Sequence, residues 1–260
     1  KDASSTAIYG SRAANGVVYI TTKKGRGNRP TVTIKGQYGF SQLAQNKLSP
    51  MNSEQYLNFQ EMLDPSLKNN EAFQADKAYT LKHGIYTDWL DYVAKNNAPT
   101  YQIDMSISGV TNTTNYYISA SHLDQDGIMP RSGTKRESFR TNIETKLNEW
   151  LKVGANVGLA YQAYENTAST TNSWYNPVNF AKWARPDMSP YEIIDNPDGT
   201  ISYGDRLNYI KKGGLYNPLY LLENQVDDRT KISINGNTFI QLTPIKGLTI
   251  RAAQAIDAYD

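Results

Sequence analysis

Cysteine is absent from the 260 residues, and histidine occurs only at His83 and His122. The missing thiols exclude disulfides, thiolate metal sites and a cysteine nucleophile. Two isolated histidines favour ordinary surface positions over a metal or catalytic site. Because no convergent set of acid, base or metal ligand stands out, we expect no metal, no cofactor and no enzymatic activity.

The chain also lacks a large net charge and long apolar runs. The formal net charge of +2 is too small to indicate nucleic-acid binding. No apolar run approaches the ~20 residues of a membrane helix, which excludes helical spans only. Tyrosine, in contrast, is common, with 19 residues against 6 phenylalanines. Its apolar ring and polar hydroxyl suit strands and binding surfaces.

Seven segments alternate apolar and polar residues with a period of two, which is typical of half-buried β-strands. The clearest pair runs from Phe139 to Leu147 and from Leu151 to Tyr161, with a turn at Asn148 between them. The other five begin near Thr31, Tyr101, Tyr116, Lys231 and Leu248. The pattern predicts antiparallel strands with one apolar face and one polar face.

Short and long connections between these segments alternate strictly. Tight turns are predicted near Asn112, Asn148 and Lys246, and the long loops are residues 41–100, 122–137 and 163–228. Membrane β-barrels have short turns on the periplasmic side and long loops outside. We therefore predict an all-β transmembrane antiparallel β-barrel, with the apolar face toward outer-membrane lipid. A secreted all-β carbohydrate-binding or adhesion module is the alternative, and it would bury the apolar face within one compact domain.

Seven strands do not close such a barrel, because open sheet edges are not tolerated in lipid. A plugged lumen needs about 22 strands, so we expect the chain to hold roughly the first third of a barrel. We expect the polar face to line the lumen and to contact a plug, water and, at a few positions, solute. Its members are Lys35, Gln102, Asp104, Arg140, Asn142, Glu144, Lys146, Lys152, Asn156, Lys231, Asn235, Asn237 and Arg251.

The long loops contain their own helix signals. Asn52 precedes a helical pattern with Gln55 three residues later, which predicts a capped helix start. A second short helix is predicted over Asn70 to Lys82, and a capped helical turn over Thr87 to Tyr92.

Two short motifs favour turns over chemistry. Ser132 and Lys135 have the spacing of a penicilloyl-serine motif, but they lie in a loop and partner motifs are missing. The segment from Asn196 to Gly199 resembles a calcium loop, but Ile194 stands where a carboxylate is needed, so a β-turn is predicted.

The first residues carry a family resemblance. The segment from Asp2 to Gly25, DASSTAIYGSRAANGVVYITTKKG, resembles the end of the plug domain in SusC/RagA-family TonB-linked outer-membrane transporters. Further matches follow in family order at Tyr86 to Leu90, Ser106 to Gly109, Asp124 to Ile128 and Leu151 to Gly154. The similarity is good to about Tyr164 and loose beyond it.

The resemblance implies an organisation. Residues 1–25 are the C-terminal end of an α+β plug domain, residues 26–30 a linker, and residues 31–260 the N-terminal part of the barrel. The implied plug–barrel junction residues are Tyr9, Gly10, Arg12, Asn15 and Gly16. The chain opens on Lys1 within the motif, so we expect a longer protein whose TonB box and most of whose plug precede it.

The resemblance also implies a function. We expect TonB-dependent import of a bulky nutrient across a bacterial outer membrane, with a SusD-like surface lipoprotein as a lid. The TonB complex would act through the part before Lys1. Oligosaccharide is the first expected cargo and oligopeptide the second.

The third long loop offers candidate cargo contacts. Aromatic rings stack on apolar patches of sugar rings, while amide groups take sugar hydroxyls. The candidates are Trp174, Tyr175, Trp183 and Tyr203, with Asn172 and Asn176. The alternative is that these aromatic residues pack the loop against itself or against the lid.

Overall fold

The computed structural model describes residues 23–25, 27, 29–44, 49–166, 176–209, 217–224 and 227–260. A 7-stranded sheet dominates it, in the order β1-β2-β3-β4-β5-β8-β9, with every neighbouring pair antiparallel. The strands are β1 (Thr31–Ser41), β2 (Ala98–Val110), β3 (Thr114–Asp126), β4 (Gly133–Lys146), β5 (Leu151–Asn166), β8 (Asp227–Ile245) and β9 (Leu248–Tyr259). The sequence predicted all seven.

The register places the two predicted faces on opposite sides of the sheet. Across the apolar face, Ile107 pairs with Val32 on one side and with Ile118 on the other. Across the polar face, Asp104 pairs with Lys35 and with Ser121. Side chains alternate sides along a strand, so this register gives an apolar face and a polar face over all seven strands.

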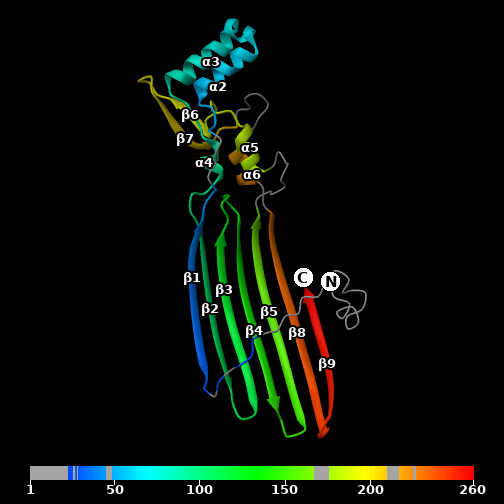
Figure 1. Ribbon diagram of the computed structural model, residues 1–260. Helices are drawn as coiled ribbons and strands as arrows, with labels where there is room; N and C mark the ends of the chain where they lie inside the picture. The colour runs from blue at the N-terminus through cyan, green and yellow to red at the C-terminus, as the bar shows by residue number, and fades with distance from the viewer. Residues whose placement is uncertain are drawn as a thin grey trace.

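The long connections all leave from one end of the sheet, where helices α2 to α6 gather, and tight turns close the other end (Figure 1). The predicted long loops are each wider than the connections in the structure, and the second differs most. Strands β3 and β4 run on to Asp126 and from Gly133, so their connection spans residues 127–132 and not 122–137. Salt bridges of Asp126 with Lys95 (2.9 Å) and of Asp124 with Lys135 (3.5 Å) support these polar strand ends, beyond the apolar alternation.

Above the sheet, the long loops fold into a small unit that we call the loop cap (Figure 1). It contains α2 (Ser53–Leu63), the 3-10 helix η2 (Pro65–Asn69), α3 (Glu71–Lys82), α4 (Trp89–Val93), α5 (Pro177–Trp183), α6 (Pro218–Asn224) and the hairpin of β6 (Tyr191–Asp195) and β7 (Ile201–Leu207). The hairpin was not predicted.

The helix starts follow the predicted caps. The side chain of Asn52 accepts a hydrogen bond from the Gln55 backbone (2.8 Å), and Gln55 accepts one from the Asn52 backbone (3.1 Å), which is a capping box. Asn70 caps α3, and Gly84 follows that helix with a φ of 61°. The predicted turn at Asn196 to Gly199 joins β6 to β7, with a φ of 77° at Gly199.

The apolar face of the sheet has no protein layer over it among the described residues. Val32 and Ile34 are each 66% exposed, and large apolar side chains of β2, β4, β5, β8 and β9 are exposed as well. A soluble module would bury such a face, so the structure disfavours the secreted-module alternative. Within the described ranges, the helices are all too short or too polar to cross a membrane.

Candidate functional site: the polar face and the loop cap

The segment just before β1 lies against the polar face and is held there by two asparagines. Asn115 of β3 accepts a hydrogen bond from the Gly25 backbone N–H (2.7 Å) and donates one to the Gly25 carbonyl oxygen (3.0 Å). Asn142 of β4 donates to the carbonyl oxygen of Lys23 (2.6 Å). We call Asn115 and Asn142 the asparagine pair. Together they bind the backbone of alternate residues of one segment.

Two further contacts fasten the same segment. Glu144 forms salt bridges with Lys24 and with Lys152 (2.8 Å between Oε2 and Nζ). The backbone N–H of Val110 donates to the carbonyl oxygen of Gly27 (3.0 Å). The segment is therefore attached to three neighbouring strands of the sheet, β2, β3 and β4.

Gly25 approaches the sheet too closely for any side chain. A Cβ atom at this position would overlap the carbonyl oxygens of Gly109 and Tyr116, which belong to the backbone and do not move aside easily. The Asn142 residue is only 4% exposed, and its Oδ1 atom is buried without a hydrogen-bond partner among the described residues.

A second close contact lies toward the turn end of the same face. The ring of Phe239 lies where a Cβ of Gly154 would be, so a side chain at that position would displace it. The guanidinium of Arg251 lies 4.1 Å from the centre of the Phe239 ring, in a cation–π contact. The polar face is thus closely packed locally, although its side chains are hydrophilic.

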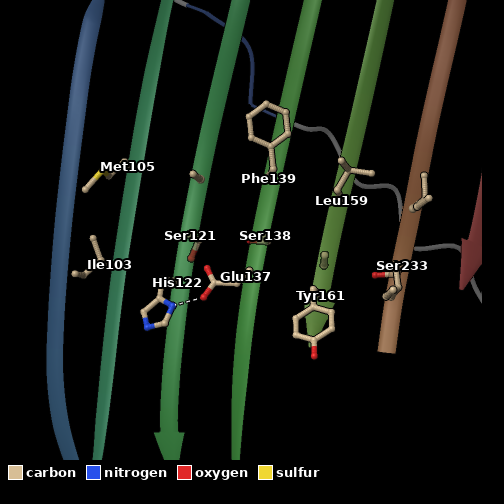
Figure 2. A pocket seen from close by; sticks show the side chains of 14 residues that line it. Ile103, Met105, Ser121, His122, Glu137, Ser138, Phe139, Leu159, Tyr161 and Ser233 are labelled. Atoms are coloured by element: carbon tan, nitrogen blue, oxygen red, sulfur yellow. Dashed lines mark hydrogen bonds and ion pairs between the residues drawn. The ribbon is translucent and has the colours of Figure 1, made fainter. Parts of the chain in front are cut away.

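The apolar face carries a shallow hollow near the loop end, with a volume of about 570 Å³. Figure 2 shows its lining, including Ile103, Met105, Phe139, Leu159 and Tyr161. His122 and Glu137 lie beside these side chains with 2.5 Å between Nδ1 and Oε1. The apolar lining fits lipid chains, and the polar pair lies on the loop side of it.

The loop cap has a hydrophobic core that joins the first and third long loops. Trp89, Val93, Ala181, Met188 and Leu222 form it. Hydrogen bonds between the two loops reinforce this core.

These hydrogen bonds run from the first long loop to backbone oxygens of the third. Trp89 donates its Nε1 hydrogen to the carbonyl oxygen of Arg185 (2.9 Å), and Thr87 donates its hydroxyl to that of Met188 (2.7 Å). Ser53 donates to the carbonyl oxygen of Pro186 (3.1 Å) and also, within the first loop, to that of Ile85 (2.6 Å). The two long loops therefore fold as one unit.

A buried ion pair lies beneath α2. Arg185 binds Asp187 through two hydrogen bonds of 2.9 and 2.7 Å, and its guanidinium lies 5.2 Å from the ring centre of Tyr56. Burial raises the pKa of Tyr56, and the positive charge of Arg185 partly opposes that shift. The tyrosine stays neutral, so this cluster is structural.

The predicted cargo contacts are only partly placed. Asn176 caps α5 by accepting hydrogen bonds from the Val178 and Asn179 backbones, which gives its side chain a structural role. Trp183 ends α5 and is 68% exposed, and Tyr203 lies on β7 and is 53% exposed. Trp174, Tyr175 and Asn172 lie outside the described residues, as do the predicted junction residues Tyr9, Gly10, Arg12, Asn15 and Gly16.

Asn115 and the Arg185–Asp187 pair were missed by sequence reasoning. A signal existed for Asn115, because asparagine is disfavoured within strands and this one follows a tight turn on the polar side of β3. For Arg185 and Asp187, the sequence carried no signal other than the intervening Pro186. The described part of the chain contains no cluster of three or more metal-ligating side chains.

Comparison with known proteins decides the family. No family model matches the chain. It is 28% identical to the TonB-dependent receptor P3 of Formosa agariphila, over 96% of this chain and 23% of that protein. It is 33% identical to the TonB-dependent receptor SusC of Bacteroides thetaiotaomicron, over 76% of this chain and 21% of that protein.

A solved structure of the RagAB peptide transporter matches with a TM-score of 0.79 and 31% identity, over 99% of this chain and 31% of that one. The same importer in its "open-open" state matches with a TM-score of 0.77. This chain belongs to the SusC/RagA family of TonB-dependent receptors. Receptors of this family reside in the outer membrane and are not enzymes. The chain spans about a fifth of the length of the curated SusC/RagA relatives it matches.

Proposed function

We propose that the receptor containing this chain imports a bulky nutrient across the outer membrane, driven by TonB. The observation that supports this best is the sheet itself. Its apolar face is bare while its polar face holds the segment at Lys23 to Gly25. A barrel wall between lipid and a plugged lumen has this arrangement. Membership of a family of TonB-dependent receptors supports transport into the cell.

The proposed organisation assigns residues 1–25 to the end of the plug, residues 26–30 to a linker and residues 31–260 to the first strands of a barrel. β1 and β9 are the edges of the sheet. Because unpaired edges are costly in lipid, strands outside this chain pair with both of them. A barrel of about 22 strands has room for a plug.

The proposed partners are the TonB complex, acting on the plug, and a SusD-like lipoprotein that covers the loop cap. The cap offers such a partner exposed apolar side chains at Met62 and Leu63, at the end of α2. Exposed apolar side chains of this kind are typical of contact surfaces.

The first proposed cargo is an oligosaccharide. The exposed rings of Trp183 and Tyr203 support it, since aromatic faces stack on sugar rings. An oligopeptide is the second candidate, because the solved relatives bear the names of a peptide transporter and importer.

Uptake by the full-length receptor tests these proposals. The receptor would be expressed with its lipoprotein in outer membranes, with and without TonB, and given labelled glycan and peptide panels. Uptake of one class only with TonB present is expected. Uptake that is equal without TonB would contradict the proposed mechanism.

A stacking role predicts a specific pattern among variants. Trp183→Ala and Tyr203→Ala should weaken glycan uptake severalfold, whereas Tyr203→Phe keeps the ring and should retain most of it. Peptide uptake that responds to these variants, with no glycan uptake, would transfer the cargo assignment to oligopeptides.

A further inference from the structure

The asparagine pair recognises backbone and not side chains. Asn115 binds both the N–H and the carbonyl oxygen of Gly25, and Asn142 binds the carbonyl oxygen of Lys23. In an extended segment, the polar backbone groups of residues two apart point the same way. Two amides on adjacent strands therefore act as a short substitute for a neighbouring β-strand.

The bound segment carries glycine where it lies closest to the sheet. Gly25 lies against the backbone oxygens of Gly109 and Tyr116 with no space for a Cβ atom. The Oδ1 atom of Asn142 is buried and has no hydrogen-bond donor among the described residues, which is unfavourable for a polar atom.

Charge adds to the attachment. Glu144 lies beside Asn115 in the strand register and carries salt bridges to Lys24 and Lys152. Its side chain is 13% exposed, so water screens these contacts less than at a free surface. The segment thus has hydrogen bonds and an ion pair within three successive residues.

We propose that the asparagine pair is the fixed anchor of the plug end. It holds Lys23 to Gly25 on the barrel wall while the rest of the plug is drawn away. The proposal deepens the proposed TonB-driven import and rests on it. Asn115 and Asn142 are positioning residues in this scheme: they limit how much of the plug can be extracted, so that a path opens without detaching the plug from the wall.

Single-molecule pulling on the full-length receptor in lipid tests this. The plug would be pulled from its N-terminal side through a bound TonB domain, and the released length recorded. In the parent receptor we expect extension to stop with Lys23 still attached. In the Asn115→Ala/Asn142→Ala double variant the stop should be lost, and freeing residues 23–30 adds roughly 28 Å at ~3.5 Å per residue.

Asn156→Ala is the matched control. Asn156 lies beside Asn142 on the same face, and within the described ranges it makes no hydrogen bond to residues 23–25. It should leave the stop unchanged. Equal released lengths at equal force in the parent and double variant would overturn the proposal, and so would a stop that Asn156→Ala removes to the same degree.

Gly25→Ala provides an independent test, because it pushes the segment off the wall without altering either asparagine. It should lower the force at the stop. Barrel assembly of every variant is checked by its heat-modifiable mobility on gels. If Gly25→Ala does not assemble, the asparagine variants still decide the question. Pulling needs no cargo, so a failed anchor and a failed import function give different results.

Discussion

The sheet and the loop cap bury apolar side chains in opposite ways. Among the described residues, most buried hydrophobic side chains belong to the cap, while the far larger sheet contributes only Ala98 and Phe239. The cap builds a core of its own, as a domain in water must. The sheet leaves its apolar face bare, as the proposed contact with lipid requires. Under the proposed function the cap folds in water and the sheet in lipid, although the chain passes between them repeatedly.

Glycines show a related contrast between an edge strand and a central strand of the sheet. Gly36 and Gly39 of β1 have open space where a side chain would be, whereas Gly154 of β5 and Gly158 meet Phe239 and Asn235. Gly36 and Gly39 lie on opposite faces of an edge strand, whereas Gly154 and Gly158 lie on the polar face of a central strand. Close packing at these four positions is therefore found on the central strand and not on the edge strand.

The largest effect is expected from Trp89→Ala in the cap. Trp89 is 2% exposed, lies in the cap core and donates a hydrogen bond to Arg185. Truncating a buried tryptophan costs about 3–5 kcal/mol. The cap should unfold at lower denaturant, detected by proteolysis of the long loops, while the barrel keeps its heat-modifiable mobility.

Trp183→Ala is the control for that prediction. Its side chain is 68% exposed, so the cap should change by at most about 0.5 kcal/mol. Simultaneous loss of cap and barrel in Trp89→Ala would refute the separation of the two parts.

The second effect concerns the apolar face. Val157 lies midway along β5 and pairs with Thr141 and Gly236 on that face. An arginine at the bilayer midplane costs about 2–4 kcal/mol, so Val157→Arg should impair assembly in outer membranes. Asn156→Arg, one residue away and on the polar face, should assemble. Normal assembly of both variants would count against lipid contact at Val157.

The third effect tests packing on the polar face. Gly154→Ala would force the Phe239 ring aside and disturb its contact with Arg251. Overpacking costs typically ~1–3 kcal/mol, measurable as a lower unfolding midpoint of the receptor in detergent. Gly36→Ala, with no atom within 4 Å of the added Cβ, should have little effect. Equal costs at both positions would mean that Gly154 is packed no more closely than the edge position Gly36.

Much of the sheet could be predicted because each strand is under one simple constraint. A strand between lipid and a polar lumen alternates with period two, as Phe139 to Leu147 does. The helix starts at Asn52 and Asn70 were predictable for a similar reason, since capping is a local interaction. The alternation of apolar and polar residues stops before the end of β3, so its polar continuation to Asp126 was missed.

The site was less predictable because its contacts are distant in sequence. Asn115 and Gly25 are 90 positions apart, and Thr87 and Met188 are 101 apart. No local pattern encodes such partners. The β6–β7 hairpin was missed although its turn was predicted, because the strands that flank this turn are short.

The smallest effect is a pH dependence within the cap. Tyr79 of α3 donates its hydroxyl hydrogen to Asp195 of β6 (2.7 Å), and this hydrogen bond raises the pKa of Tyr79 from 10.0 to about 12. Below pH 10 the hydroxyl is protonated in both the folded and the unfolded cap, so the stabilisation is fully present. Between pH 10 and 12 unfolding releases a proton, and stability therefore falls as the pH rises. Tyr79→Phe should abolish this fall, measured as the denaturation midpoint of the cap against pH, together with the loss of one late step in tyrosinate absorbance.

Tyr92→Phe is the matched control, since its hydroxyl makes no hydrogen bond within the described part of the chain. It should keep the fall in stability above pH 10. The Tyr79–Asp195 contact is exposed to solvent, unlike the cap core around Trp89, so its loss should leave the cap folded at neutral pH. Unfolding of Tyr79→Phe at neutral pH would show that the cap depends on its surface links as much as on its core. That result would weaken the contrast with the sheet, because stability in the cap would then not come from buried apolar side chains.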